Sequence, residues 1–314
     1  MSLSKNLYKE LSLITSNAAV AAFHFIGKND KNAADKAAVD VMRKMLNDMN
    51  INGKIVIGEG ELDEAPMLYL GEELGDRNGI PIDIAVDPVE GTNFVAKNMP
   101  GGLSVMAISN KGNLFNAPET YMDKIAVSKD IPNECVDLDY SVEENINNIS
   151  DYKKINLSEI TVCILERSRH KLTIEKLKKM GVNIKLITDG DVSGALLVAN
   201  KNSNVDMFLG IGGGPEGVLA ASALDSYGCK FQGRFIFSND KDKLRAKNLG
   251  IFDLNKKYEI NELVRGESIF CASGITDGDL VKGVRLENNV FLTETLVTHK
   301  NYLNKIVKNE IPNT

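Results

Sequence analysis

The chain has 314 residues, of which 43% are hydrophobic and 25% are charged, and its formal net charge at pH 7 is −6. This composition is typical of a globular protein with one large or two ordinary domains, and it argues against intrinsic disorder. The acidic balance argues against a nucleic-acid-binding face, but it permits an anionic substrate because bound metal ions reverse the local charge.

Targeting signals and paired cysteines are not evident. The first ten residues, MSLSKNLYKE, lack the basic and then apolar order of a signal peptide, and no apolar run is long enough for a membrane span. The four cysteines are far apart, with no Cys-x-x-Cys pair, so neither a disulfide framework nor a zinc site is indicated. We therefore expect a soluble, cytoplasmic protein with no nucleic-acid or membrane partner.

Two helices are predicted at the start of the chain. Apolar residues recur at helical spacing from Leu3 to Phe25, and Gly27 is a natural end for this helix. A second apolar stripe runs from Ala34 to Leu46. Asp35 lies in the first turns of the second helix, where the helix dipole favours a carboxylate, so its position alone does not indicate a function.

An acidic loop with two glycines follows the first predicted strand, Lys54–Ile57. Glu59 stands between the glycines at the strand end, and this position favours a metal ligand. The later acids favour a solvated turn that opens a helix over residues 67–74. They are Glu61 and Glu64, with Asp63 as another charge of that helix N-terminus.

Residues 82–92, IDIAVDPVEGT, predict a buried strand that ends in a reactive turn. Pro88 cannot donate to a strand ladder and, with Gly91, predicts a turn just past Asp87. Asp87 and Glu90 then crowd the C-terminal end of the strand, where open α/β sheets bind ligands. Two carboxylates in such a turn repel each other unless a cation lies between them, and their oxygens suit Mg²⁺ or Mn²⁺. The alternative is an ordinary acidic turn.

Two polar side chains near this turn allow both a functional and a structural interpretation. Thr92, near a helix start, could cap that helix, position a water molecule, or do both. Strands are predicted over residues 103–109, closed by a hairpin signal at residues 110–113, and over residues 124–128. Tyr121, in the loop between them, could stack on or hydrogen-bond a ligand, or it is a half-buried packing residue.

Residues 129–157 are polar, rich in asparagine and without a clear period, which is typical of a domain boundary. We therefore expect an N-terminal α+β lobe over residues 1–156 and a C-terminal α/β lobe over residues 157–314. Strands and helices alternate in the second lobe, which predicts a largely parallel sheet. The expected strands cover residues 161–165, 182–187, 205–211, 268–272 and 290–297, and the expected helices cover residues 170–180, 192–199 and 218–227.

Polar clusters follow the strands of the second lobe. Arg167 and Arg169 could grip a phosphate, or they form a basic surface turn. His170 begins a helix and is expected to cap or pack rather than act as a base. Asp189 and Asp191 flank a glycine and could bind sugar hydroxyls or cap the next helix.

Residues 212–217, GGGPEG, satisfy the spacing G-x-G-x-x-G between a strand and a helix, so a dinucleotide-binding fold has to be considered. Glu216 argues against it, because its carboxylate would face the pyrophosphate that binds at such a helix N-terminus. The same carboxylate suits a metal ion. It would place the active site in a cleft between the two lobes.

Five groups of residues resemble motifs of the GlpX-type, class II fructose-1,6-bisphosphatases, in the same order from about the first helix to about residue 298. The Asp-Pro-x-Glu-Gly-Thr element alone indicates only the wider lithium-sensitive, metal-dependent phosphatase superfamily, which includes inositol monophosphatases. The groups are residues 58–67, 87–92, 116–118 with 121–122, 189–191, and 210–213 with 215–217.

This resemblance implies a layered α/β/α/β/α sandwich, two or more Mn²⁺ or Mg²⁺ ions, and a homo-oligomer, dimer or tetramer. The implied metal ligands are Asp35, Glu59, Asp87, Glu90 and Glu216. The implied substrate contacts are Glu90, Gly91, Thr92, Tyr121, Arg167, Ser168, Arg169, Asp189, Gly190, Asp191 and Gly213. Thr92 with Asp63 would orient and deprotonate the attacking water.

The implied activity is cytoplasmic, gluconeogenic hydrolysis of the 1-phosphate of fructose 1,6-bisphosphate. Sedoheptulose 1,7-bisphosphate is the nearest competing substrate, because it has the same end groups. A nucleotide-binding oxidoreductase and a non-catalytic sugar-phosphate sensor are the alternatives from other classes.

The chain departs from the family pattern at three places. Ser168 stands where proline is expected, so the grip of the two neighbouring arginines is less rigid. Residues 238–250 form a shorter segment than in many relatives, and Asn93 with Phe94 differ from the common forms. These last two departures concern oligomer contacts and regulation rather than the chemistry.

Overall fold

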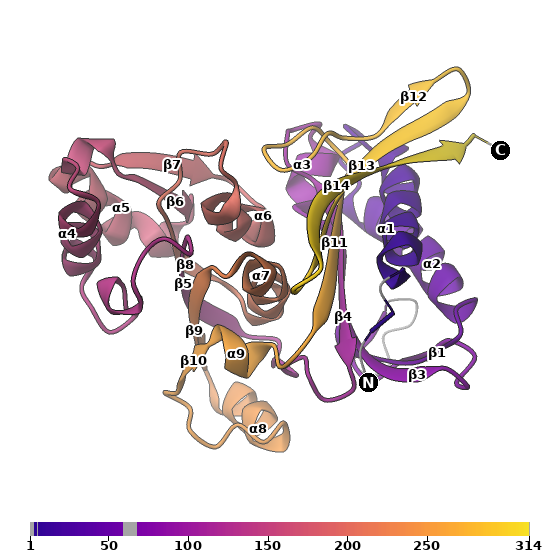
Figure 1. The fold of residues 1–314 in the computed structure, drawn as a ribbon, viewed down its shortest axis with the longest axis horizontal. Helices are drawn as coiled ribbons and strands as arrows, with labels where there is room; N and C mark the ends of the chain where they lie inside the picture. The colour runs from indigo at the N-terminus through magenta and orange to yellow at the C-terminus, as the bar shows by residue number, and fades with distance from the viewer. Residues whose placement is uncertain (1–2, 5, 59–67, 314) are drawn as a thin grey trace. The chain divides into compact units, whose positions relative to one another are not determined.

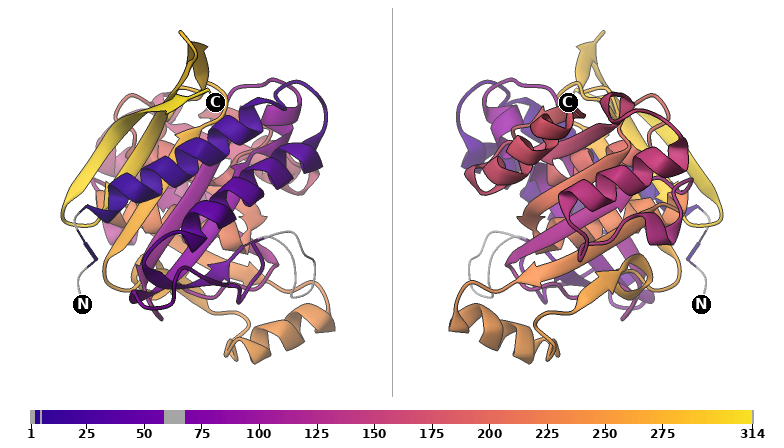
Figure 2. Two further views of the ribbon diagram at one scale, coloured as in Figure 1. Left: turned by 90° about the vertical axis from the view of Figure 1, so that its right-hand side faces the viewer. Right: turned by 90° about the vertical axis from the view of Figure 1, so that its left-hand side faces the viewer.

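The computed structural model describes residues 3–4, 6–58 and 68–313 (Figures 1 and 2). The chain divides into two compact units. Unit 1 contains residues 1–116 and 263–314, and unit 2 contains residues 117–262. Each unit has its own β-sheet, which confirms the expected α/β class. None of the helices in the described ranges is both long and apolar enough to cross a lipid bilayer.

Unit 1 is built on an eight-stranded sheet with the order β12-β13-β11-β4-β3-β1-β2, and β14 also pairs with β13. β1 and β3 are parallel, and the other neighbours are antiparallel. The strands are β1 (Ile51–Ile57), β2 (Glu73–Leu74), β3 (Ile80–Glu90), β4 (Leu103–Asn110), β11 (Ser268–Gly274), β12 (Arg285–Glu287), β13 (Val290–His299) and β14 (Leu303–Pro312). The helices are α1 (Leu7–Phe23), α2 (Lys31–Asn47) and α3 (Thr92–Ala96).

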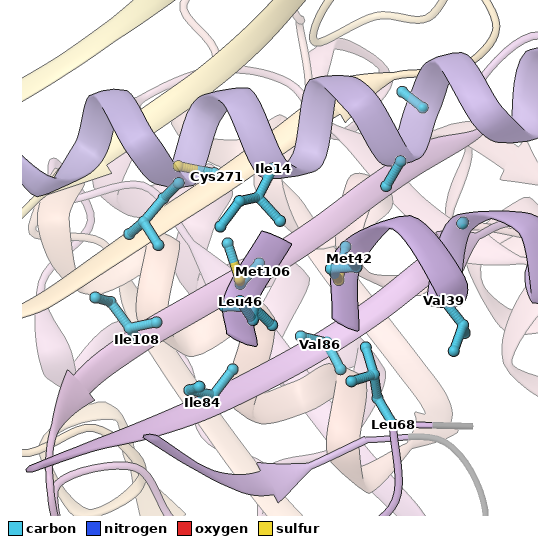
Figure 3. Close-up of a cluster of buried hydrophobic side chains, with 14 of the residues drawn as sticks. Ile14, Val39, Met42, Leu46, Leu68, Ile84, Val86, Met106, Ile108 and Cys271 are labelled. Carbon is cyan, nitrogen blue, oxygen red and sulfur yellow. The ribbon is translucent and has the colours of Figure 1, made fainter. Parts of the chain in front are cut away.

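The core of unit 1 lies between this sheet and the helices α1 and α2, which run side by side over one face (Figure 2). Ile14 of α1 and Met42 of α2 point into this core (Figure 3). Alternate strand residues, Ile82, Ile84 and Val86 of β3, meet them from the sheet. The apolar stripes of α1 and α2 and the alternate apolar residues of β3 therefore face one another and form one buried layer.

Unit 2 is built on a six-stranded sheet with the order β10-β9-β5-β8-β6-β7. The strands are β5 (Tyr121–Val127), β6 (Thr161–Leu165), β7 (Asn183–Ile187), β8 (Met207–Gly213), β9 (Lys230–Ile236) and β10 (Lys257–Glu259). The α-helices are α4 (Val142–Lys153), α5 (Lys171–Met180), α6 (Asp191–Leu196), α7 (Gly214–Tyr227), α8 (Asp240–Asn248) and α9 (Ile260–Leu263), and a 3-10 helix covers Ser168–His170.

Helices cover both faces of the sheet in unit 2. Ile146 and Ile149 of α4 and Leu177 of α5 pack on one face against Ile125 and Val127 of β5. The helices α6 and α7 lie on the other face (Figure 1). Unit 1 therefore has two layers and unit 2 has three.

The structure divides the chain differently from the boundary expected after residue 156. That point falls inside unit 2, between α4 and β6. The strands β11 and β13, expected in the second lobe, belong to the sheet of unit 1, where β11 pairs with β4 in register from Ser268↔Ser109 to Gly274↔Leu103. Pairing between segments so far apart in sequence leaves no local pattern, so composition alone does not reveal it.

Four local expectations are also corrected. The sheet of unit 2 is mixed rather than largely parallel, because β5, β9 and β10 add antiparallel pairs beside β6, β7 and β8. Residues 68–74, where a helix was expected, are not helical and end in the short strand β2. The turn at residues 110–113 leads to a bridge with residue 264 instead of closing a hairpin. The segment 129–157 contains the helix α4.

Candidate active site

The end of β3 contains a β-bulge instead of the predicted turn. Asp87 pairs with Val105 of β4, and Glu90 pairs with Leu103, so three residue steps on β3 match two on β4. The strand therefore continues past Pro88 and ends at Glu90. The turn predicted just past Asp87 begins only at Gly91, because a bulge accommodates the proline without ending the strand.

This bulge decides the direction of the two carboxylates. In a regular strand, residues three apart point to opposite faces. Leu103 and Val105 are two apart on β4, so their partners Asp87 and Glu90 lie on one face of the sheet. It is the face away from α1 and α2, because Val86 points into their core. Asp87 is half-buried, and Glu90 is 5% exposed.

The residues after Glu90 start the short helix α3. Gly91 is the N-cap residue with a φ of 76°, and a Cβ there would lie 2.7 Å from the Phe94 ring, so only glycine fits. Thr92 is the first residue of α3. The interpretation of Thr92 as N-cap is therefore wrong, because the chain turns one residue earlier. Its hydroxyl is not needed to cap the helix.

Asp35 is 7% exposed in the second turn of α2. Helix capping does not explain its burial, because the Asp30 side chain accepts the hydrogen bond from the Ala33 N–H at 2.9 Å. The link between α1 and α2 is fastened to the end of α3, since the N–H groups of Gly27 and Asn29 donate to carbonyls of that helix. Glu59 and Asp63, the other two acids predicted in this unit, lie outside the described residues.

In unit 2, polar groups from neighbouring strand ends lie close together. The Arg167 guanidinium donates to Asp189 Oδ1 at 3.1 Å and to the Thr188 carbonyl. The Arg169 guanidinium lies 4.8 Å from the centre of the Tyr121 ring, and its Nε–H donates to the Ile211 carbonyl at 2.9 Å. Tyr121 is the first residue of β5 rather than part of a loop, and it is 49% exposed. Arginine, carboxylate and aromatic groups thus form one polar cluster.

His170 is a packing residue, as predicted. Its Nε2 accepts a hydrogen bond from the Ile211 N–H at 2.7 Å, so the proton is on Nδ1, which donates to the Leu165 carbonyl at 2.7 Å. Burial lowers the pKa of this imidazole below its ordinary value. The neutral ring therefore ties the arginine-bearing turn to β8.

The glycines of the G-x-G-x-x-G pattern are explained by close packing. A Cβ on Gly212 would lie 2.2 Å from Asp191 Oδ2, one on Gly214 would lie 2.8 Å from the Phe235 ring, and one on Gly217 would lie 2.6 Å from Met122 Sδ. The pattern therefore does not require a dinucleotide. It allows α6 and α7 to approach the sheet.

Glu216 lies in the first turn of α7, as the sequence predicts. Its Oε2 would be 1.8 Å from a Cβ on Gly213, so the carboxylate lies against the backbone at the helix N-terminus. Burial raises the pKa of Glu216 above its ordinary value, while the positive charge of Lys124 acts in the opposite direction. The position where a pyrophosphate would bind is thus occupied by a carboxylate, which disfavours the oxidoreductase alternative.

A pocket of about 480 Å³ opens beside this carboxylate in unit 2. Tyr121, Gly213 and Glu216 were predicted to contact ligands, and all three line it. The other lining residues are Glu119, Thr120, Pro215, Ser238, Asn239 and Asp242. Sequence reasoning missed these, although the Asn-x-x-Asp spacing at residues 239–242 is a helix-capping pattern that predicts the start of α8.

Lys124 was also missed. From the sequence it is placed only in a strand, yet charged residues such as Lys124 and its neighbour Asp123 are themselves an unusual signal beside the apolar residues of β5. The Lys124 side chain is 1% exposed. Its ammonium donates to Asp191 Oδ2 and to the Gly213 carbonyl, so it connects two predicted site residues.

The carboxylates of unit 1 have the right chemistry for a divalent cation. Asp87 and Glu90 offer hard oxygen ligands from one face of a sheet, which fits Mg²⁺ or Mn²⁺. Within residues 3–4, 6–58 and 68–313, no group of three or more His, Cys, Asp or Glu side chains is close enough to hold a metal ion.

Comparisons with known proteins also indicate a phosphatase. The family model described as "Bacterial fructose-1,6-bisphosphatase, glpX-encoded" matches residues 5–310. A protein of Synechococcus sp. (strain JA-3-3Ab), named D-fructose 1,6-bisphosphatase class 2/sedoheptulose 1,7-bisphosphatase, is 42% identical over 313 residues, covering 92% of this chain and 90% of that protein. A protein of the same name from Prochlorococcus marinus (strain MIT 9301) is 40% identical over 309 residues, covering 94% and 92%.

Among solved structures, the extragenic suppressor protein suhB from Bartonella henselae aligns with a TM-score of 0.37 and 10% identity, covering 63% of this chain and 73% of that one.

The α/β fold of the present chain, the carboxylates and arginines at the strand ends and the matched sequences define its class as a phosphoric monoester hydrolase. The chain belongs to the family of bacterial, glpX-encoded fructose-1,6-bisphosphatases.

Proposed function

We propose that this protein hydrolyses the 1-phosphate of fructose 1,6-bisphosphate, with fructose 6-phosphate and phosphate as products. The observation that carries the proposal is the bulge that brings Asp87 and Glu90 to one face of the sheet, immediately before Thr92. The relatives named for this reaction support the choice of substrate. Sedoheptulose 1,7-bisphosphate remains a second candidate substrate, because those names include it as well.

Divalent metal ions, two or more Mg²⁺ or Mn²⁺, would neutralise the phosphate and lower the pKa of a water molecule. The carboxylates that would hold them are Asp35, Glu59, Asp87, Glu90 and Glu216. We assign to Thr92 and Asp63 the task of orienting the attacking water and accepting its proton. We assign to Gly91 a substrate contact next to Thr92.

The second phosphate of the substrate would bind to the turn at residues 167–169, which carries Arg167 and Arg169. Within the described residues, Arg169 donates only its Nε–H, so its four other N–H groups are available to a phosphate. Arg167 already donates to Asp189 and Thr188, so we assign it to positioning the loop. The sugar hydroxyls would meet residues 189–191, the Tyr121 side chain and the backbone at Gly213, with Ser168 at the edge of the turn.

The location of the protein in the cell, its pathway and its assembly are also proposals. We propose a cytoplasmic enzyme of gluconeogenesis that forms a homo-oligomer, dimer or tetramer. Light scattering of the purified protein measures the assembly: a mass near the 34.3 kDa of one chain contradicts it.

The test of the function is phosphate release from fructose 1,6-bisphosphate in Mn²⁺, in Mg²⁺ and in EDTA. We expect release with a metal ion, none in EDTA, and none from fructose 6-phosphate under any condition. Sedoheptulose 1,7-bisphosphate, assayed side by side, ranks the two substrates. Binding of the bisphosphate without release in either metal would instead favour the sugar-phosphate sensor. Thermal stabilisation by NAD would revive the oxidoreductase alternative.

A further inference from the structure

Lys124 is the largest fully buried side chain in the described part of the protein. A buried ammonium carries a large desolvation penalty, so lysine is almost never buried without a partner. Gly217 of α7 packs closely against this side chain, because a Cβ there would lie 3.3 Å from Lys124 Cδ. The chain therefore keeps a lysine where an apolar residue would pack without this penalty.

The partners of Lys124 come from two different loops. Its Nζ donates to Asp191 Oδ2 at the start of α6 and to the Gly213 carbonyl at 2.6 Å, at the end of β8. Asp191 and Gly213 were both predicted to bind substrate. Gly213 also lines the pocket. A single cation thus connects two strand-end loops that carry site residues.

One of the two carboxylate oxygens of Asp191 accepts no hydrogen bond from the described residues. The residue is 8% exposed, and within the described residues its Oδ1 has no hydrogen-bond partner, whereas Oδ2 is held by Lys124. A Cβ on Gly212 would lie 2.2 to 2.8 Å from the atoms of this carboxyl group, so the glycine backbone limits its rotation. A buried acceptor with no partner calls for a donor, and a sugar hydroxyl is such a donor.

We propose that Lys124 is a positioning residue: it holds Asp191 so that the second carboxylate oxygen accepts a hydroxyl of the sugar phosphate. Lys124 itself does not touch the substrate. This inference rests on the proposed function, because it takes a sugar phosphate as the ligand. It adds to the site a residue that reaches the sugar through Asp191 and not by direct contact.

The experiment measures fructose 6-phosphate binding by calorimetry, and KM and kcat for the bisphosphate in Mn²⁺, in four proteins. They are the wild type, Lys124→Met, Asp191→Asn and the double variant. We expect the Kd and KM of each single variant to rise about tenfold or more, the usual cost of one hydrogen bond to a charged group. We expect the double variant to match Asp191→Asn within about twofold, since Lys124 acts through Asp191.

Thermal unfolding separates positioning from a purely structural role. Lys124→Met leaves a buried carboxylate without its cation, so its Tm should fall, and the double variant should recover part of the loss because both charges are gone. A folded Lys124→Met protein with wild-type Kd and KM overturns the inference. If that variant does not fold, the double variant is the test. The inference is overturned if the double variant binds the sugar phosphate as tightly as the wild type does. It is also overturned if the double variant binds clearly more weakly than Asp191→Asn.

The matched control is Lys153→Met, which removes a lysine paired with Asp206 in the same unit and should leave Kd and KM unchanged. Failure of the proposed function has a different signature. A wild-type protein that binds fructose 6-phosphate but releases no phosphate contradicts the proposed activity alone. A wild-type protein that binds no fructose 6-phosphate overturns the inference as well.

Discussion

Asp87 and Glu90 show how one inserted residue sets the chemistry of a site. Their spacing of three would place them on opposite faces of a regular strand, and the bulge at residues 88–89 restores a common face. Pro88 is tolerated there because a bulge does not need its missing N–H. Bulges are enriched beside active sites, where they redirect side chains. The common face of the two carboxylates therefore depends on the bulged pairing of β3 with β4 and not on sequence spacing alone.

If these carboxylates hold metal ions, removing either charge should stop turnover without unfolding the protein. We expect Asp87→Asn and Glu90→Gln to lower kcat by more than about 100-fold, since even outer-shell partners of metal ligands cost 10- to 100-fold. Phosphate release and thermal unfolding measure the two effects. Asp40→Asn, which removes an exposed carboxylate paired with Lys36, is the control and should change neither. Folded variants with near-normal rates would contradict the assignment.

At the scale of elements, the turn between β3 and α3 depends on a residue without a side chain. Gly91 has a positive φ of 76°, and the Phe94 ring fills the position of a possible Cβ. The glycine thus allows the chain to pass from the bulge into α3 within one residue, and Thr92 follows directly after the carboxylates.

Gly91→Ala should destabilise the protein through both strain and a clash. We expect the free energy of unfolding to fall by about 2 to 5 kcal/mol, the sum of the left-handed backbone cost and of overpacking against Phe94. Gly112→Ala is the matched control, because Gly112 has a φ of 84° but nothing lies within 4 Å of a Cβ there. It should cost only about 1 to 2 kcal/mol. Urea unfolding measures both, and equal losses would show that Phe94 plays no part.

At the scale of the whole molecule, unit 2 is an insertion between two parts of unit 1. The chain segments on either side of it pair with each other: the Phe115 N–H donates to the Leu263 carbonyl at 2.9 Å, and the Arg265 N–H donates to the Asn113 carbonyl at 2.8 Å. All strand pairs of the six-stranded sheet come from residues 117–262. The ends of the insertion are therefore close, and its sheet and core are its own.

This arrangement predicts that residues 117–262 fold as an isolated fragment. We expect cooperative urea unfolding of the fragment, followed by circular dichroism. The control fragment 157–262 begins at the boundary that composition indicates and lacks β5 and α4. It should not fold, because β5 pairs with both β8 and β9. Cooperative unfolding of the shorter fragment, or none in the longer one, would contradict the division.

Local sequence determined much of this protein. The apolar stripes of α1 and α2 and the alternation along β3 encode elements within a few turns or strand steps, so they predict these elements correctly. The carboxylates at residues 87 and 90 and the arginines at residues 167 and 169 are candidates that the sequence alone offers, because strand ends and polar clusters are local features. The conclusion that the chain is an α/β phosphatase follows from motifs of this kind.

Only the tertiary structure decided the rest. The membership of β11 and β13 in the sheet of unit 1, the common face of Asp87 and Glu90, and the pairing of Lys124 with Asp191 all depend on contacts between segments distant in sequence. Such contacts are chosen by burial and hydrogen bonding of the whole chain, and they leave no periodic trace in the residues that make them. Residue type and local period fix what each segment can form, whereas long-range pairing fixes what each side chain faces.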